Sequence, residues 1–76
     1  MFETVSRCVT EVLEVDAADV NPDARFAEDL SANSLTLIEV MMAFEEAFGI
    51  EVREADVAGV ATVGDACALV SRLLEQ

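Results

Sequence analysis

Apolar residues recur every three or four positions in three separate stretches of this chain, the spacing that gives an α-helix one buried face. The first stretch lies within residues 2–15, where Cys8 falls at the margin of an arc formed by Phe2, Val5, Val9, Val12 and Leu13. The last begins at Thr62, which makes a capping-box pattern with Asp65. Its arc consists of Val63, Ala66, Cys67, Val70, Leu73 and Leu74. Each pattern predicts a helix that packs one face into a core.

The middle stretch predicts a helix from about Ser34 to Phe48 that carries two apolar stripes. It follows Asn33, which is suited to cap a helix, and stops at Gly49, which readily adopts left-handed backbone. The broader stripe is the expected core face and consists of Leu37, Val40, Met41, Phe44 and Phe48. The narrower stripe consists of Leu35, Ile38 and Met42, flanked by Glu39, Glu45 and Glu46. Because carboxylates seldom surround a core residue, we expect the narrower stripe to be exposed.

The segments between these helices show weaker patterns. Residues 16–31 contain the only proline, Pro22, and lack sustained periodicity, so they predict a long loop. Three apolar residues of this loop are expected to anchor it in the core: Val20, Phe26 and Leu30. A short helical turn is expected at residues 54–57, ended near Gly59. We therefore predict an all-α fold, a small four-helix bundle of three main helices and one short helix with a long loop between the first two.

The charge of the chain changes the expected partners. Sixteen Asp and Glu residues against four Arg give a formal charge of −12, which repels nucleic acids and anionic membranes. We expect no nucleic-acid binding and attraction to basic protein surfaces, although the acidity could also serve solubility alone. No apolar run approaches the roughly 20 residues that span a bilayer, and no export signal is apparent. We expect one domain over residues 1–76, a cytoplasmic monomer without membrane insertion.

Ser34 is the strongest candidate for a chemical site, because it stands where the loop meets the acid-flanked helix. With Asn33 as the cap, the Ser34 hydroxyl should face solvent. The chain contains no histidine and no lysine to activate that hydroxyl, so Ser34 is better interpreted as a residue that another enzyme modifies. Cys8 and Cys67 are too few and too far apart for a disulfide framework or a metal cluster. We expect unbridged thiols and no metal site.

Four segments in register make the chain resemble an acyl carrier protein over essentially its whole length. They are residues 26–30, 33–35, 44–52 and 62–66, which are similar to the family's loop, attachment motif, second-helix end and last-helix start. The resemblance implies that Ser34 carries 4′-phosphopantetheine through a phosphodiester, with acyl groups held as thioesters on the terminal thiol. The protein would then be a carrier and a substrate of other proteins, and not an enzyme.

The same resemblance implies partners and a binding pocket. The partners would be a phosphopantetheinyl transferase and acyltransferases, ketosynthases, reductases or other acyl-processing enzymes with basic docking patches. The docking residues would be Asn33, Leu35, Ile38, Glu39, Met42, Glu45 and Glu46. A growing acyl chain would fold back between the helices into a pocket lined by Phe26, Leu30, Leu37, Met41, Phe44, Val57, Val60 and Leu69.

Three positions depart from the family's usual pattern. Asn33 stands where aspartate is usual, Thr36 where an acidic residue is frequent, and Arg53 where proline is frequent. The lost charge before Ser34 weakens the case for a general transferase and favours a dedicated pathway. Fatty-acid and polyketide biosynthesis both fit. Two alternatives stay open: an aminoacyl or peptidyl carrier of a specialised pathway, and an unmodified helical adaptor that binds partners through its acidic face.

Overall fold

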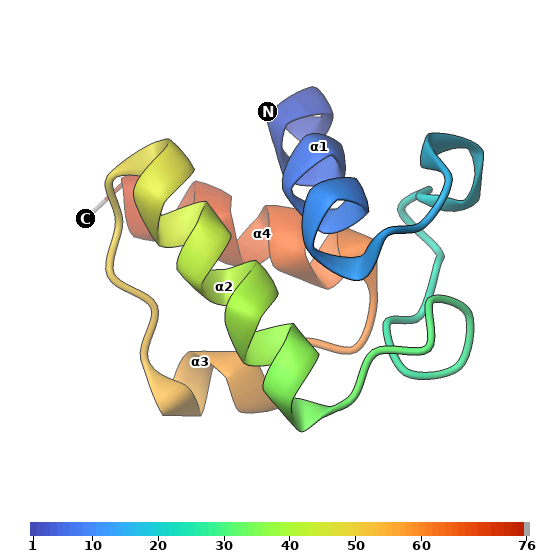
Figure 1. Cartoon of the computed structure of the whole chain (residues 1–76). Helices are drawn as coiled ribbons and strands as arrows, with labels where there is room; N and C mark the ends of the chain where they lie inside the picture. The colour runs from blue at the N-terminus through green and yellow to red at the C-terminus, as the bar shows by residue number, and fades with distance from the viewer. Residues whose placement is uncertain (76) are drawn as a thin grey trace.

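Four α-helices form the fold in residues 1–75, the part of the chain that the computed structural model describes. They are α1 (Phe2–Leu13), α2 (Ser34–Phe48), α3 (Glu54–Ala58) and α4 (Val63–Leu74), with a 3₁₀ turn at Ala17–Asp19. Figure 1 shows the long loop after α1 at one end of the molecule and the short α3 below α2. The predicted all-α fold of three main helices and one short helix is confirmed. Within residues 1–75, no helix has the length and apolar character needed to cross a membrane.

The core lies between α1, α2 and α4 and consists mostly of aliphatic side chains. The largest fully buried side chains are Phe44, Val5, Val9, Val40, Val63 and Val70. The three predicted loop anchors, Val20, Phe26 and Leu30, are all buried in this core, so that prediction is confirmed. Because no polar or charged residue is buried in residues 1–75, apolar burial is the main stabilising term.

Both ends of α1 and the last residue of α4 differ from the sequence-based expectation. Helix α1 stops at Leu13 and not near residue 15, because Glu14 adopts the left-handed conformation at φ 55°. Phe2 and Leu74 were expected on core faces but are 36% and 47% exposed. They are the first residue of α1 and the last of α4, so they extend beyond the part of each helix that its neighbours cover. Cys8, expected at the margin, is buried.

The long loop is more ordered than its lack of periodicity suggested. Besides the 3₁₀ turn, it pairs through its backbone with the start of α4. The Val63 N–H donates to the Ala24 carbonyl and the Gly64 N–H to the Pro22 carbonyl, both at 2.9 Å. Gly64 permits this approach, since a Cβ there would lie 2.9 Å from the Pro22 oxygen. The loop therefore leads into α2 from a fixed position on α4.

The structure confirms the predicted start of α4 and the predicted end of α2. The Thr62 hydroxyl accepts from the Asp65 N–H at 3.1 Å, and the Asp65 carboxylate accepts from the Thr62 and Ala61 N–H groups at 3.0 Å each. These backbone N–H groups hold the pKa of the Asp65 carboxyl below its usual range. Gly49 ends α2 at φ 67°, the left-handed conformation that favours glycine.

The two cysteines are unbridged, as expected. Burial raises the pKa of the Cys8 thiol and of the Cys67 thiol, which keeps both protonated near neutral pH. Cys8 points its sulfur toward the Ala43 carbonyl at 3.9 Å, between α1 and α2. Both thiols are packing groups in this structure.

Candidate functional site

Ser34 is the first residue of α2 and follows a complete reciprocal cap. The Asn33 side-chain oxygen accepts from the Thr36 N–H at 2.9 Å, and the Thr36 hydroxyl accepts from the Asn33 N–H at 2.9 Å. This is a capping box in which threonine takes the place of the usual glutamate. Thr36 therefore acts structurally at the position where the sequence suggested only a missing charge.

Ser34 is an exposed residue at the start of α2. The first turn of α2 contains no acidic residue. Among the described residues, the N–H groups of Ser34 and Leu35 have no hydrogen-bond acceptor. Unpaired amides at the positive end of a helix dipole favour a bound anionic group. The surroundings of Ser34 therefore fit a phosphodiester attached to its hydroxyl.

The segment before Ser34 holds it in place. Leu30 is buried in the core, and the Ala32 N–H donates to the Phe26 carbonyl at 2.8 Å. Between them, Ser31 adopts left-handed backbone at φ 58° and turns the chain toward α2. Ser34 thus stands on a rigid support, although its own side chain is free in solvent.

The narrow apolar stripe of α2 is exposed, as predicted. Leu35, Ile38 and Met42 are 67%, 47% and 60% exposed. Glu39 and Glu46 are exposed beside them, and α2 itself contains no basic residue. Three large apolar side chains in a row on the surface are typical of a protein contact.

Glu45 does not share the environment of its two neighbours. Its side chain is only partly exposed, and its carboxylate accepts from the Val52 N–H at 2.9 Å. The bond joins the last third of α2 to the connection that leads into α3. The sequence pattern grouped Glu45 with Glu39 and Glu46 because all three flank the apolar stripe, but it could not show this bond.

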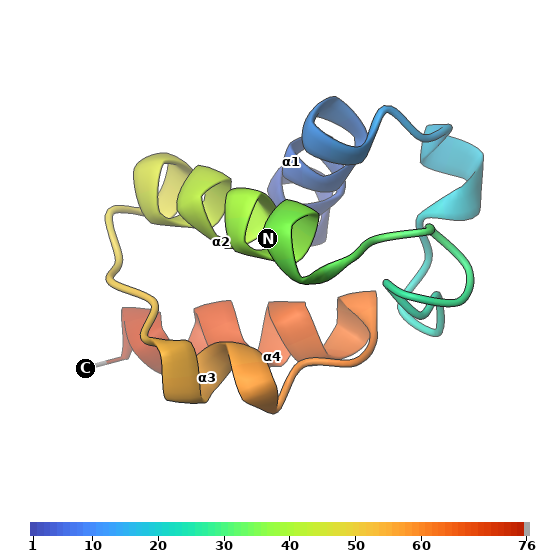
Figure 2. The same cartoon turned by 60° about the horizontal axis from the view of Figure 1, so that its bottom comes forward.

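A groove of about 540 Å³ runs between α2 and the segment that contains α3. In both Figure 1 and Figure 2, α3 lies below α2. The α2 wall consists of Ser34, Leu37, Ile38, Met41, Met42 and Glu45, and the opposite wall of Val52, Glu54, Val57, Ala58 and Val60. The lining is mostly apolar, and Ser34 lies at one end of it. The serine and an apolar groove are therefore parts of one site.

The predicted pocket residues separate into two groups. Four of them line the groove: Leu37, Met41, Val57 and Val60. The other four, Phe26, Leu30, Phe44 and Leu69, are buried in the core and do not line it. Ile38 and Met42 line the groove, although the sequence pattern indicated them only for docking. The signal for them was present: residues 34, 37, 38, 41, 42 and 45 share one helical stripe that starts at the serine.

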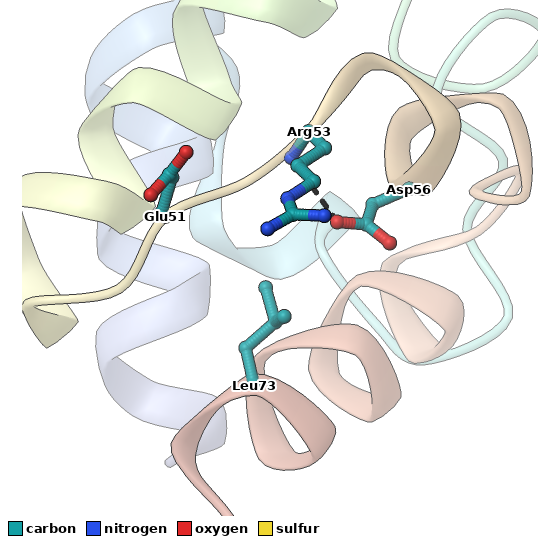
Figure 3. Close-up of a pocket in the computed structure, with 4 residues that line it drawn as sticks. All are labelled: Glu51, Arg53, Asp56 and Leu73. Carbon is teal, nitrogen blue, oxygen red and sulfur yellow. Dashed lines mark hydrogen bonds between the residues drawn. The ribbon is translucent and has the colours of Figure 1, made fainter. Parts of the chain in front are cut away.

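A second hollow, of about 240 Å³, lies between the α2–α3 connection and α4 and is lined by Glu51, Arg53, Asp56 and Leu73 (Figure 3). The Asp56 carboxylate accepts from the Arg53 backbone N–H at 3.1 Å and pairs with Arg72 of α4 at 3.1 Å. This hollow shares no lining residue with the groove at Ser34. We interpret it as the place where α3 is fastened to α4. In the described part of the chain, no three His, Cys, Asp or Glu side chains are placed to hold one metal ion.

Comparison with known proteins identifies the family of this chain. The pattern that describes a phosphopantetheine attachment site matches residues 3–70. The chain is 44% identical over 70 residues to the acyl carrier protein of Solidesulfovibrio magneticus strain RS-1, covering 92% of this chain and 90% of that protein. The chain belongs to the acyl carrier protein family. An acyl carrier protein is a carrier and not an enzyme, and its cofactor is 4′-phosphopantetheine.

Family membership also gives the general kind of partner. An acyl carrier protein interacts with a phosphopantetheinyl transferase and with acyl-processing enzymes.

Proposed function

We propose that Ser34 is the attachment residue of this carrier, and that the carrier delivers acyl thioesters to enzymes of fatty-acid or polyketide biosynthesis. The observation that supports this most directly is the exposed Ser34 hydroxyl at the uncharged first turn of α2, at one end of an apolar groove. When bound, the arm supplies a terminal thiol that holds an acyl group as a thioester.

The attachment step needs chemistry from the transferase. The Ser34 Oγ forms a bond to the phosphorus that carries pantetheine in coenzyme A, the pyrophosphate P–O bond breaks, and 3′,5′-ADP leaves. The hydroxyl proton goes to a base of the transferase, because the carrier has no histidine or lysine. The carrier's own contribution is to present the hydroxyl and to stabilise the new phosphodiester with the free N–H groups of Ser34 and Leu35.

The groove supports an acyl chain as cargo. Its apolar side chains are Leu37, Ile38, Met41, Met42, Val52, Val57, Ala58 and Val60. Burying each methylene there would contribute up to about 0.8 kcal/mol, and less where the open side of the groove leaves the chain in contact with water. The deeper residues of the predicted pocket, such as Phe44, would join only if the helices part. An apolar groove gives no reason to prefer an aminoacyl group.

The α2 face supports a docking role. Leu35, Ile38 and Met42 would provide apolar contact, and Glu39 and Glu46 would orient basic partners in the field of a −12 chain. Asn33 stands beside this face, but its side chain is committed to the cap. We propose that docking uses the exposed stripe and its two exposed glutamates, with Asn33 contributing through the cap.

Intact-mass measurement tests the attachment residue. Wild-type protein, Ser34→Ala and Ser71→Ala are incubated with coenzyme A and a broad-specificity transferase. Ser71 is a matched control because it is an exposed serine on α4. Wild type and Ser71→Ala should gain the mass of one arm, and Ser34→Ala should gain none. Modification of Ser34→Ala would overturn the assignment, and failure of the wild type with every transferase tried would favour the unmodified adaptor.

A further inference from the structure

Glu45 is unlike the other acidic residues of α2 because it belongs to the groove. Its carboxylate lines the groove and accepts from the Val52 N–H at 2.9 Å, and Val52 lines the groove from the opposite wall. Glu39 and Glu46 are exposed and do not line it. The Glu45–Val52 bond therefore joins the two walls.

This bond lies at the end of the groove away from Ser34. Ser34 and Glu45 are eleven residues apart on the same stripe of α2, which corresponds to about 16 Å at a rise of 1.5 Å per residue. Between them the α2 wall is apolar, with leucine, isoleucine and two methionines. At the far end the lining becomes acidic, because Glu54 lies two residues after Val52 and lines the same wall.

We propose that Glu45, held by the Val52 N–H, closes the far end of the groove and sets the length of acyl chain that the groove accepts. The inference rests on the proposed attachment at Ser34. Glu45 is a positioning residue for the cargo and contacts no reacting atom. It would act by holding the groove wall that contains Val52 against α2.

The physical reason lies in what a longer chain would have to displace. To pass between α2 and Val52, the chain end must separate the carboxylate from the amide. The partly buried Val52 N–H would then lose its acceptor, and the carboxylate would face methylene groups in place of a hydrogen-bond donor. A chain that ends before this bond causes neither loss. The benefit of each added carbon pair should therefore stop at a definite length.

Thermal unfolding of a graded series of loaded carriers measures that length. Pantetheinylated protein is loaded with straight saturated chains from four to sixteen carbons, and each melting temperature is compared with that of the unloaded pantetheinylated form of the same variant. The variants are Glu45→Ala, which removes the bond, Glu45→Gln, whose amide oxygen can still accept from Val52, and Glu46→Ala as the matched control. Glu46 is the adjacent exposed glutamate, so its replacement removes the same charge without touching the bond.

In the wild type, each two-carbon extension that fits should raise the melting temperature by about 3 to 6 °C, for a chain half-buried in an open groove. The rise should then stop. In Glu45→Ala the melting temperature should keep rising for at least one further two-carbon extension. In Glu45→Gln and Glu46→Ala it should stop rising at the same chain length as in wild type.

The outcomes separate the two proposals. If no arm is attached, the proposed function itself fails, as intact mass will show before any loading. If the melting temperature of Glu45→Ala stops rising at the same chain length as in wild type, the closing role of Glu45 is overturned while attachment stands. The same holds if Glu45→Gln or Glu46→Ala shifts this chain length as far as Glu45→Ala does. If Glu45→Ala does not fold, hydrogen exchange at the Val52 amide in wild type decides. Exchange should accelerate only with chains beyond the limit, and unchanged exchange at every length refutes the inference.

Discussion

Replacing Leu35 with alanine should weaken the carrier's reactions with its partner enzymes and leave the protein folded. Leu35 follows Ser34, the proposed attachment residue, and 67% of its surface is exposed. Complete burial of a leucine side chain contributes about 1.5–3 kcal/mol, so covering the exposed two-thirds on docking contributes about 1–2 kcal/mol. Loss of that contact corresponds to a decrease of roughly 5- to 30-fold in affinity.

Transfer of phosphopantetheine from coenzyme A provides the assay, with kcat/KM and the melting temperature measured on the same preparations. The matched control is Leu74→Ala, because Leu74 is a leucine on α4 that is 47% exposed and outside the proposed docking face. We expect Leu35→Ala to lose roughly 5- to 30-fold in kcat/KM, whereas the covered third of Leu35 and the covered half of Leu74 limit the loss of stability to about 1 and 1.5 kcal/mol. Normal transfer by Leu35→Ala, or an equal loss in Leu74→Ala, would refute a specific docking role for the stripe.

Two further predictions concern the support of the site. Gly64→Ala should lower stability by about 1–3 kcal/mol, because the added Cβ would lie 2.9 Å from the Pro22 oxygen. The control Gly59→Ala, whose Cβ would have its closest contact at 3.8 Å, should be neutral or stabilising by about 0.4–1 kcal/mol. Urea unfolding measures both variants, and equal effects would contradict the close approach at Gly64. The lowered pKa of Asp65 means that its cap stabilises the fold above the ordinary Asp pKa and that this stabilisation is lost as pH falls through the folded-state value. Urea midpoints of wild type and Asp65→Asn should therefore differ at neutral pH, begin to converge below about pH 3.9 and coincide only below the lowered folded-state pKa, and a difference that persists at that lower pH would exclude this carboxylate as its source.

Local chemistry made α2 and α4 predictable from the sequence. Asn33 and Gly49 mark the ends of α2, and Thr62 with Asp65 marks the start of α4. Each signal involves residues within a few positions of one another, and side-chain or backbone geometry at those positions suffices to stop or start a helix. The end of α1 had no such signal, because Glu14 takes a left-handed conformation that glutamate seldom adopts.

Contacts between distant segments set the limits of prediction in the candidate site. The loop before Ser34 is held by backbone bonds to residues 61–64, and no periodicity encodes such a pairing. Similarly, the division of the apolar residues between core and groove depends on where α3 lies. Phe44 and Met41 share one stripe of α2, yet Phe44 lies in the core while Met41 also faces the groove. The stripe shows which residues are apolar together, but not which helix covers them.

The two walls of the groove are held by different kinds of contact. The α2 wall is fixed by its cap and by the core residues Val40 and Phe44, whereas α3 has no buried residue. Val52, Val57 and Val60 are only partly buried against the core. Two polar contacts also fasten this wall: Glu45 with Val52, and Asp56 with the exposed side chain of Arg72. Elements with few buried apolar groups open at lower free-energy cost than core helices. We therefore expect the α3 wall to move when cargo enters or leaves, while Ser34 keeps the fixed position at which partner enzymes reach it.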